Sequence, residues 1–303
     1  MHPFWRRTPL PFLLLMPMLA HPADAPLQLK LRSRPVNPAA DAAASSAPPV
    51  VEKRVAWDPK HTAIIVVDMW DDHWCKSAAR RVAELAVPMN ALLKIARSRG
   101  LTVIHAPSTV TGFYQNTPQR ARARSAPYTR PAVPLSTAER WGTAWCWPDP
   151  AREKELPIDD SDMGCDCPSK CTIRDAWTRQ LATIELGPDD AITDDGQETL
   201  NVLAQGGIEN VIVLGVHLNM CVLGRPFGVR QLVKQGRNVV LMRDMTDTMY
   251  NPEKSPRVSH FAGTELVIEH VEKYWCPTIL STDFTGQPEF RFKADPRTHS
   301  AVR

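Results

Sequence analysis

The body of this chain alternates short apolar runs with longer segments of helical periodicity. Residues 62–68 (TAIIVVD) form a continuous apolar run, which is typical of a strand buried on both faces of a parallel sheet. Residues 78–99 follow with apolar side chains at helical spacing, and Gly100 predicts the end of this helix. Further strands are predicted at 101–106, 181–186, 210–215 and 238–243, and further helices at 197–206, 222–235 and 263–274. This alternation predicts an α/β fold, a three-layer doubly wound parallel sheet with helices on both faces.

One long stretch interrupts the alternation. Residues 107–178 are rich in Pro, Arg, Trp and Cys and show no periodic pattern. Loops of this length are uncommon in compact domains unless they serve a function. We therefore expect a Pro/Cys-rich insertion, packed over one end of the sheet, within a domain that spans residues 56–285. Residues 286–303 are interpreted as a C-terminal tail.

The N-terminal residues do not follow the domain pattern. Residues 1–25 combine a short basic start with an apolar stretch at 10–20, which is typical of a signal peptide and too short to span a bilayer. The alternative is an apolar N-terminal helix of the fold. Residues 26–55 are rich in Ala, Pro and Ser and predict a flexible linker. The sequence thus predicts export, to the periplasm or the outside of the cell.

Charge and hydropathy exclude two classes of partner. The net charge is +3, but residues 1–55 hold seven Lys/Arg against three Asp/Glu, which leaves 29 against 30 for the other 248 residues. A nearly neutral body does not predict nucleic-acid binding, which needs a basic patch on the folded domain. The sequence has no apolar run of 18 residues, so no membrane span is expected. A small-molecule substrate remains the expected partner.

Candidate functional residues follow the predicted strands. Ligands of doubly wound sheets bind beyond the carboxyl ends of the strands. Asp68 ends the first strand, and Cys221 lies at a strand-to-helix turn. At such a turn the positive end of the helix favours the nucleophilic thiolate, and backbone N–H groups can bind an oxyanion. The alternative is that Cys221 is a small buried apolar residue.

Asp68 and the segment 215–223 (GVHLNMCVL) together resemble the isochorismatase-like cysteine hydrolases, which include nicotinamidases, N-carbamoylsarcosine amidases and isochorismatases. The resemblance covers about residues 60–110 and 178–282. The segments DMWDDHWC (68–75) and RDMTDTMYNP (243–252) also resemble an exported bacterial subgroup of the family. The resemblance implies cleavage of an amide-type C–N bond through a thioester at Cys221, with Asp68 as general acid and base. It also implies a cis peptide bond between Val216 and His217, which shapes an oxyanion hole with the N–H of Cys221, and a homo-oligomer.

The chain departs from this family at the expected lysine. The corresponding position falls on Glu185 or Leu186, and a carboxylate there would raise the pKa of a nearby thiol. Lys76 or Lys170 could take the place of the lysine in space. The missing lysine motivates an alternative, a catalytically degenerate, ligand-binding member of the same fold.

Several further residues are expected to line the pocket, and some of them are possible zinc ligands. Residues that we expect to line a substrate pocket are Trp70, His73, His105, Glu185 and Asn219. The segment after the second strand has one histidine and no carboxylate, so a zinc site of the nicotinamidase type is not expected. His73, His105 and His217 could still bind zinc or orient a substrate. No cofactor is therefore assigned, and zinc stays an open alternative.

The seven cysteines are an odd number, so at least one stays outside any set of intrachain disulfides. In an exported protein we favour disulfides, with Cys75–Cys276 as one possible pair and Cys221 left as the free thiol. A zinc site built from four other cysteines is the alternative, and a thiol-redox function is a third. Those four cysteines are Cys146, Cys165, Cys167 and Cys171.

Overall fold

The computed structural model of the protein describes residues 25–35 and 49–300. All but the last residue of the expected signal peptide lies outside these residues, as does the middle of the expected linker. Within the described part of the chain no helix combines the length and the apolar character needed to cross a bilayer.

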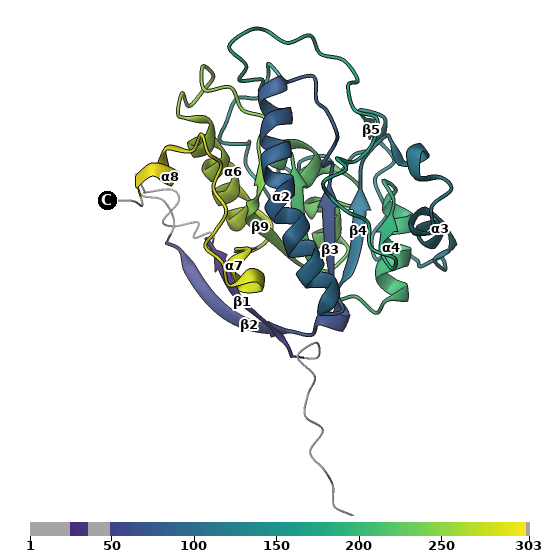
Figure 1. Ribbon diagram of the computed structural model, residues 1–303. Helices are drawn as coiled ribbons and strands as arrows, with labels where there is room; N and C mark the ends of the chain where they lie inside the picture. The colour runs from purple at the N-terminus through teal and green to yellow at the C-terminus, as the bar shows by residue number, and fades with distance from the viewer. Residues whose placement is uncertain (1–24, 36–48, 301–303) are drawn as a thin grey trace, which may run out of the picture.

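A single eight-stranded sheet forms the centre of the molecule (Figure 1). Six neighbouring strands of this sheet are parallel, and two antiparallel strands extend one edge. Its spatial order is β2 (Val51–Trp57), β1 (Leu27–Ser33), β10 (Thr278–Ile279), β9 (Asn238–Asp247), β8 (Asn210–Val216), β3 (Thr62–Val67), β4 (Thr102–Ala106) and β7 (Ala191–Ile192).

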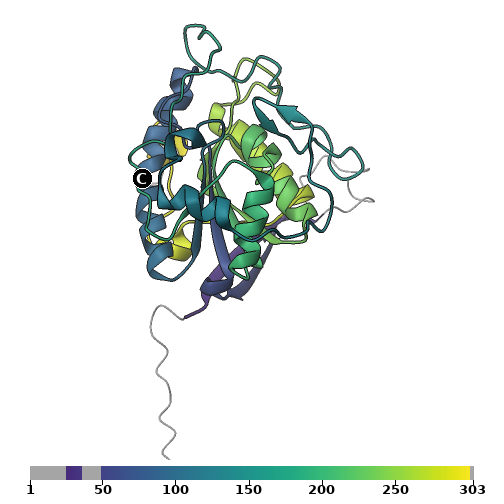
Figure 2. The same ribbon diagram turned by 90° about the vertical axis from the view of Figure 1, so that its right-hand side faces the viewer.

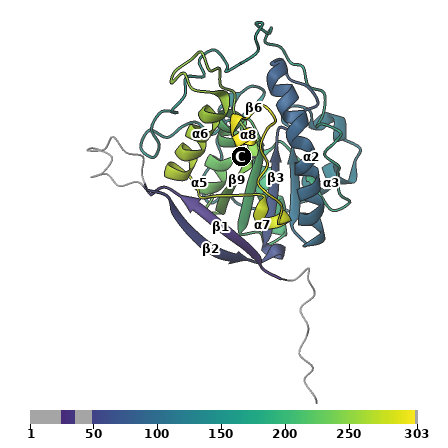
Figure 3. The same cartoon turned by 60° about the vertical axis from the view of Figure 1, so that its left-hand side comes forward.

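Helices cover both faces of the sheet, as the sequence predicts (Figures 1 and 3). Strand β3 is buried throughout. Ile64 and Val66 pack in one apolar cluster with α2 (Lys76–Ser98), and Ile65 packs in a second cluster with residues of the other helices. The helices of the second layer are α4 (Gly196–Gln205), α5 (Val229–Lys234) and α6 (His260–Tyr274). The three-layer doubly wound α/β fold is thereby confirmed.

The insertion is irregular but carries short elements. They are η3 (Thr111–Tyr114), α3 (Pro118–Ser125) and the two-stranded hairpin of β5 (Glu139–Arg140) and β6 (Thr143–Ala144). In Figure 1 the loops of the insertion, drawn in teal, run over the end of the sheet at which α2 begins, and Figure 2 shows the hairpin on the same part of the molecule. The candidate residues Asp68 and Cys221, which follow β3 and β8, lie at this end of the sheet.

The structure corrects two element predictions. Residues 181–186 form no strand; they turn back on themselves through the Ile184 N–H bond to Leu181, and β7 pairs with β4 instead. The expected helix 222–235 is split into the π-helical turn η4 (Leu218–Val222) and α5. Gly228 and the residues before it break the helix, because Pro226 cannot continue a helical hydrogen-bond ladder.

Both ends of the domain also differ from prediction. The expected linker is not flexible at its two ends, because β1 and β2 pair over seven residues each and bury Leu27 and Leu29. The expected tail is partly packed on the domain. Phe292 is buried in the α2 cluster, and two short helices follow the sheet, α7 (Thr282–Thr285) and α8 (Pro296–Ser300). The segment of β1 (LQLKLRS) alternates apolar and polar residues, which is the pattern of a half-buried strand.

Candidate active site

Asp68 lies at the end of β3 and is fully buried. Its backbone adopts a positive φ of 46°, a left-handed conformation that aspartate tolerates better than most residues. One carboxylate oxygen accepts a hydrogen bond from the Ser108 N–H at 2.7 Å. The other lies 3.4 Å from Nε of Arg225. The carboxylate is thus held in place by a backbone donor and a buried cation.

Cys221 lies on the η4 turn that follows β8 and is 5% exposed. Its thiol interacts with the Asp68 carboxylate. Gly215 lets the two strands meet at this point, because a Cβ there would lie 2.1 Å from the Val67 carbonyl oxygen. The peptide bond between Val216 and His217 is cis, as the resemblance implies.

Arg225 is the cation of this site, at a position where no motif predicts one. It follows Cys221 by four residues and is 1% exposed. Its guanidinium interacts with both the Asp68 carboxylate and the Cys221 thiol. Carbonyl oxygens of Arg140 and Trp141, each at 3.3 Å, hold it in place, together with the Thr143 hydroxyl. The i,i+4 spacing to the cysteine could have suggested it, because such residues share one helix face.

The two lysines that sequence analysis offers as substitutes lie elsewhere. Lys76 forms an exposed ion pair with Asp72 at 2.6 Å, and Lys170 lines a groove outside this site.

Burial sets the protonation of the Asp68, Arg225 and Cys221 group. It raises the pKa of Asp68, while the charge of Arg225 opposes that shift. Burial, and then the charge of Asp68, raise the pKa of the Cys221 thiol, and Arg225 again opposes the shift. The thiol therefore keeps its proton at neutral pH, and thiol and carboxylate share one negative charge that the guanidinium balances. A raised carboxyl pKa makes Asp68 a better proton acceptor for the thiol.

A cavity of about 550 Å³ opens above this group, within the range of small-molecule sites. Trp70 stacks on Trp177 with ring centroids 4.3 Å apart, and His73 stacks on the same indole at 5.6 Å. The cavity is lined by Trp70, His73, Trp74, Thr109, Trp141, Gly142, Met163, Ile173, Arg174, Asp175, Trp177, His217, Met220, Cys221, Arg225 and Met249.

Two histidines form part of the cavity wall. His73 and His217 meet edge to face with centroids 5.1 Å apart. Burial lowers the pKa of His73 to about 4 and holds that of His217 well below its ordinary value. Both rings are therefore neutral at neutral pH. Nε2 of His217 is buried without a hydrogen-bond partner among the described residues, so a polar substrate atom can bind to it.

The structure does not bring all the predicted pocket residues together. Trp70 and His73 line the cavity, but Glu185 is at the surface in an ion pair with Lys94 at 2.8 Å. The pocket assignment of Glu185 is therefore wrong, and its charge is no obstacle to an active Cys221.

His105 and Asn219 have supporting positions instead. His105 is buried between Asp190 at 2.9 Å and Gln180 at 3.0 Å, so the three histidines do not converge on one zinc site. Asn219 exchanges two hydrogen bonds with the backbone of Met249, at 2.8 and 3.0 Å. It thereby fixes a residue of the cavity wall without lining the cavity.

The expected disulfides are also absent. All seven cysteines fall within the described residues, and all are free. Cys276, the expected partner of Cys75, is buried on its own near β9, where burial raises its pKa to about 12.

Neither a family model nor a curated protein matches the sequence. Four solved structures that are similar to this chain are described as cysteine hydrolase or isochorismatase family proteins. A cysteine hydrolase from Pseudomonas syringae pv. phaseolicola 1448A is 18% identical, covers 75% of this chain and 91% of its own, and has a TM-score of 0.45. An isochorismatase family protein from Burkholderia thailandensis is 15% identical, covers 74% of this chain and 93% of its own, and has a TM-score of 0.40. An isochorismatase from Pseudomonas putida KT2440 is 10% identical, covers 75% of this chain and 91% of its own, and has a TM-score of 0.43.

Proposed function

We propose that the protein is a cysteine hydrolase that cleaves an amide-type C–N bond of a small molecule. The observation that carries the proposal is the buried group of Asp68, Arg225 and Cys221 at the base of an aromatic cavity. A nucleophile, a proton acceptor and a charge-balancing cation lie within reach of one another and of a bound substrate.

The reaction proceeds in two halves. The Cys221 thiol transfers its proton to Asp68 as the sulfur attacks the carbonyl carbon, and a C–S bond forms. Asp68 then protonates the leaving nitrogen, the C–N bond breaks, and a thioester and an amine result. Water attacks the thioester while Asp68 takes up one of its protons, and the carboxylic acid leaves. The proton on Asp68 returns to the sulfur, so the cycle balances without a further reactant.

Arg225 supplies the charge balance that these proton transfers need. The negative charge moves between the Asp68 carboxylate and the Cys221 sulfur, and the guanidinium contacts both. A fixed cation at this place costs no reorganisation during the reaction. Backbone N–H groups of the turn from His217 to Cys221 are proposed to bind the oxyanion.

The same cation favours hydrolysis over the ligand-binding alternative. That alternative rests on the missing lysine and on a carboxylate in its place. Arg225 provides a positive charge, and Glu185 is directed away to Lys94.

The cavity walls favour a particular substrate class. Trp70 and Trp177 present stacked rings, and Trp141 lies on the hairpin side of the cavity. Flat, apolar groups gain most from such walls. We therefore propose amides whose acyl part is aromatic or otherwise planar, with a polar atom that binds Nε2 of His217.

A panel of aromatic and aliphatic amides assayed with purified protein tests the proposal. Cys221→Ala is expected to lower kcat by more than about 10³-fold, while Cys276→Ala, which removes a buried thiol outside the cavity, keeps turnover. Mass spectrometry should find the acyl group of a turned-over amide on Cys221. Full turnover in Cys221→Ala, or acylation at another residue, would show that the nucleophile is assigned wrongly.

From the sequence and its resemblance to this family we also propose export through residues 1–25 and assembly into a homo-oligomer.

A further inference from the structure

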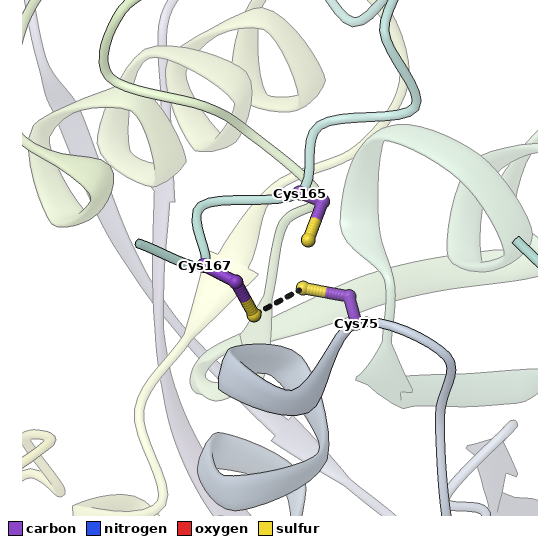
Figure 4. Close-up of side chains that lie close together, drawn as sticks. All are labelled: Cys75, Cys165 and Cys167. Atoms are coloured by element: carbon purple, nitrogen blue, oxygen red, sulfur yellow. Dashed lines mark hydrogen bonds between the residues drawn. The ribbon is translucent and has the colours of Figure 1, made fainter. Parts of the chain in front are cut away.

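Three cysteines from two distant segments of the chain converge beside the cavity (Figure 4). Cys75 caps the start of α2, and Cys165 and Cys167 lie in the insertion. Their sulfur atoms all lie within 4.8 Å of one another, and those of Cys75 and Cys167 are 3.8 Å apart. Among the described residues this is the one group of His, Cys, Asp or Glu side chains close enough to share a metal ion.

The sulfur spacing matches a metal site better than a disulfide. Zinc–thiolate bonds of about 2.3 Å in a tetrahedron place the sulfurs about 3.8 Å apart, which is the distance between Cys75 and Cys167. A disulfide has its sulfurs about 2.05 Å apart and would join two of these thiols and leave the third in contact with them. Three sulfurs around one centre fit a single shared metal ion.

A fourth ligand is available on the same loop. Cys171 follows Cys167 by four residues; its sulfur lies outside the group of three and donates to the Ser169 carbonyl oxygen at 3.8 Å. Cys165, Cys167 and Cys171 all line a groove of about 880 Å³ at the surface. A metal ion can therefore enter from solvent, while Cys75 closes the site from the buried side.

The surroundings hold these thiols in place. The Ser77 N–H, at the start of the 23-residue helix α2, donates to the Cys167 sulfur at 3.1 Å. This helix end favours negative charge. Asp166, between the two loop cysteines, binds the Arg81 guanidinium at 2.7 and 3.2 Å. Supporting hydrogen bonds of this kind orient metal ligands.

We propose that Cys75, Cys165 and Cys167 bind one zinc ion, with Cys171 as the fourth ligand. The ion is structural, because four protein ligands leave no position open. It fastens the insertion to the start of α2. Met163 and Ile173, on either side of the cysteine loop, line the cavity, and Cys75 binds Nδ1 of His73 through its backbone N–H at 3.1 Å. The zinc site thus stabilises one wall of the cavity.

The test is a titration of the full-length, reduced protein with Co²⁺ and then Zn²⁺. We expect one Co²⁺ per chain, with a thiolate-to-cobalt absorption band in the near ultraviolet and the visible bands of a tetrahedral ion. Zinc should displace both signals. Cys75→Ser, Cys165→Ser and Cys167→Ser should each weaken cobalt binding by at least about 100-fold, and Cys171→Ser should weaken it less.

Two controls keep the result interpretable. Cys276→Ser and Cys146→Ser remove buried thiols outside the cluster and should leave the cobalt spectrum unchanged. Circular dichroism identifies any variant that fails to fold, and native mass spectrometry of the unaltered protein then measures the bound metal directly. A reduced, folded protein that takes up no cobalt, or a cobalt spectrum that survives the loss of all three cysteines, overturns the proposal.

Discussion

The two cysteine-containing regions beside the cavity differ in what surrounds the sulfur. Cys221 is buried beside one carboxylate and one guanidinium, and burial keeps its proton on the sulfur at neutral pH. Cys167 lies in a surface groove, with two other sulfurs and the N–H of Ser77 around it. The first arrangement provides a place for one proton to move to, and the second provides several sulfurs for one shared ion.

The comparison shows that neighbouring groups determine the chemistry of a cysteine. The Cys221 sulfur can pass its proton to Asp68 as it attacks a substrate, because the Arg225 guanidinium balances the one negative charge that the two groups share. Clustered sulfurs repel one another as thiolates unless a cation lies among them. The same residue type therefore serves as a nucleophile at the base of the cavity and as a ligand at its wall.

Replacement of Arg225 should have the larger effect. In Arg225→Met the charge shared by Asp68 and Cys221 loses its balance, and we expect kcat/KM to fall by about 10²–10³-fold. Breaking this buried ion pair should also lower the free energy of unfolding by about 3–5 kcal/mol. Arg225→Lys keeps the charge and serves as the matched control in the same kinetic and urea-unfolding measurements. Equal losses in both variants would mean that guanidinium geometry, rather than charge, is what the site requires.

Removal of the metal should have a smaller effect, seen mainly in stability. If zinc fastens the insertion to α2, extraction by a chelator should lower Tm by about 5–10 °C and raise KM more than it lowers kcat. Differential scanning calorimetry before and after extraction, and after zinc is restored, measures the shift. Cys167→Ser should already have the lower Tm and show no further change with the chelator. An unchanged Tm in the unaltered protein would contradict the structural role.

Local patterns predict the core of this molecule well and its contacts at a distance poorly. The buried run of β3 and the periodicity of α2 are local signals, and they place Asp68 at a strand end. Arg225 reaches Asp68 from the segment between η4 and α5. Periodicity alone predicts one continuous helix there.

The thiol cluster shows the same limit over a longer distance. The spacing of Cys165 and Cys167 is visible in the sequence, but Cys75 lies 90 residues earlier. It reaches them only because α2 begins where the insertion crosses the sheet. Proximity along the chain favours grouping Cys146 with the loop cysteines, whereas the structure buries Cys146 in the core. Which cysteines meet is decided by packing, which spacing along the chain does not encode.

The central claim is that the Cys221 proton passes to Asp68, and the pH dependence of alkylation tests it most directly. The rate of iodoacetamide addition to Cys221 can be followed by peptide mass spectrometry from about pH 4 to pH 10. Because burial raises the pKa of Asp68, the carboxyl group must ionise above its ordinary range before it can accept the proton. The account predicts a rate that falls as the pH drops through this raised pKa and is level around neutral pH. In Asp68→Asn the alkylation rate should no longer be level around neutral pH. A rate that instead rises with pH throughout, as for an isolated thiol, and is the same in Asp68→Asn would contradict the account.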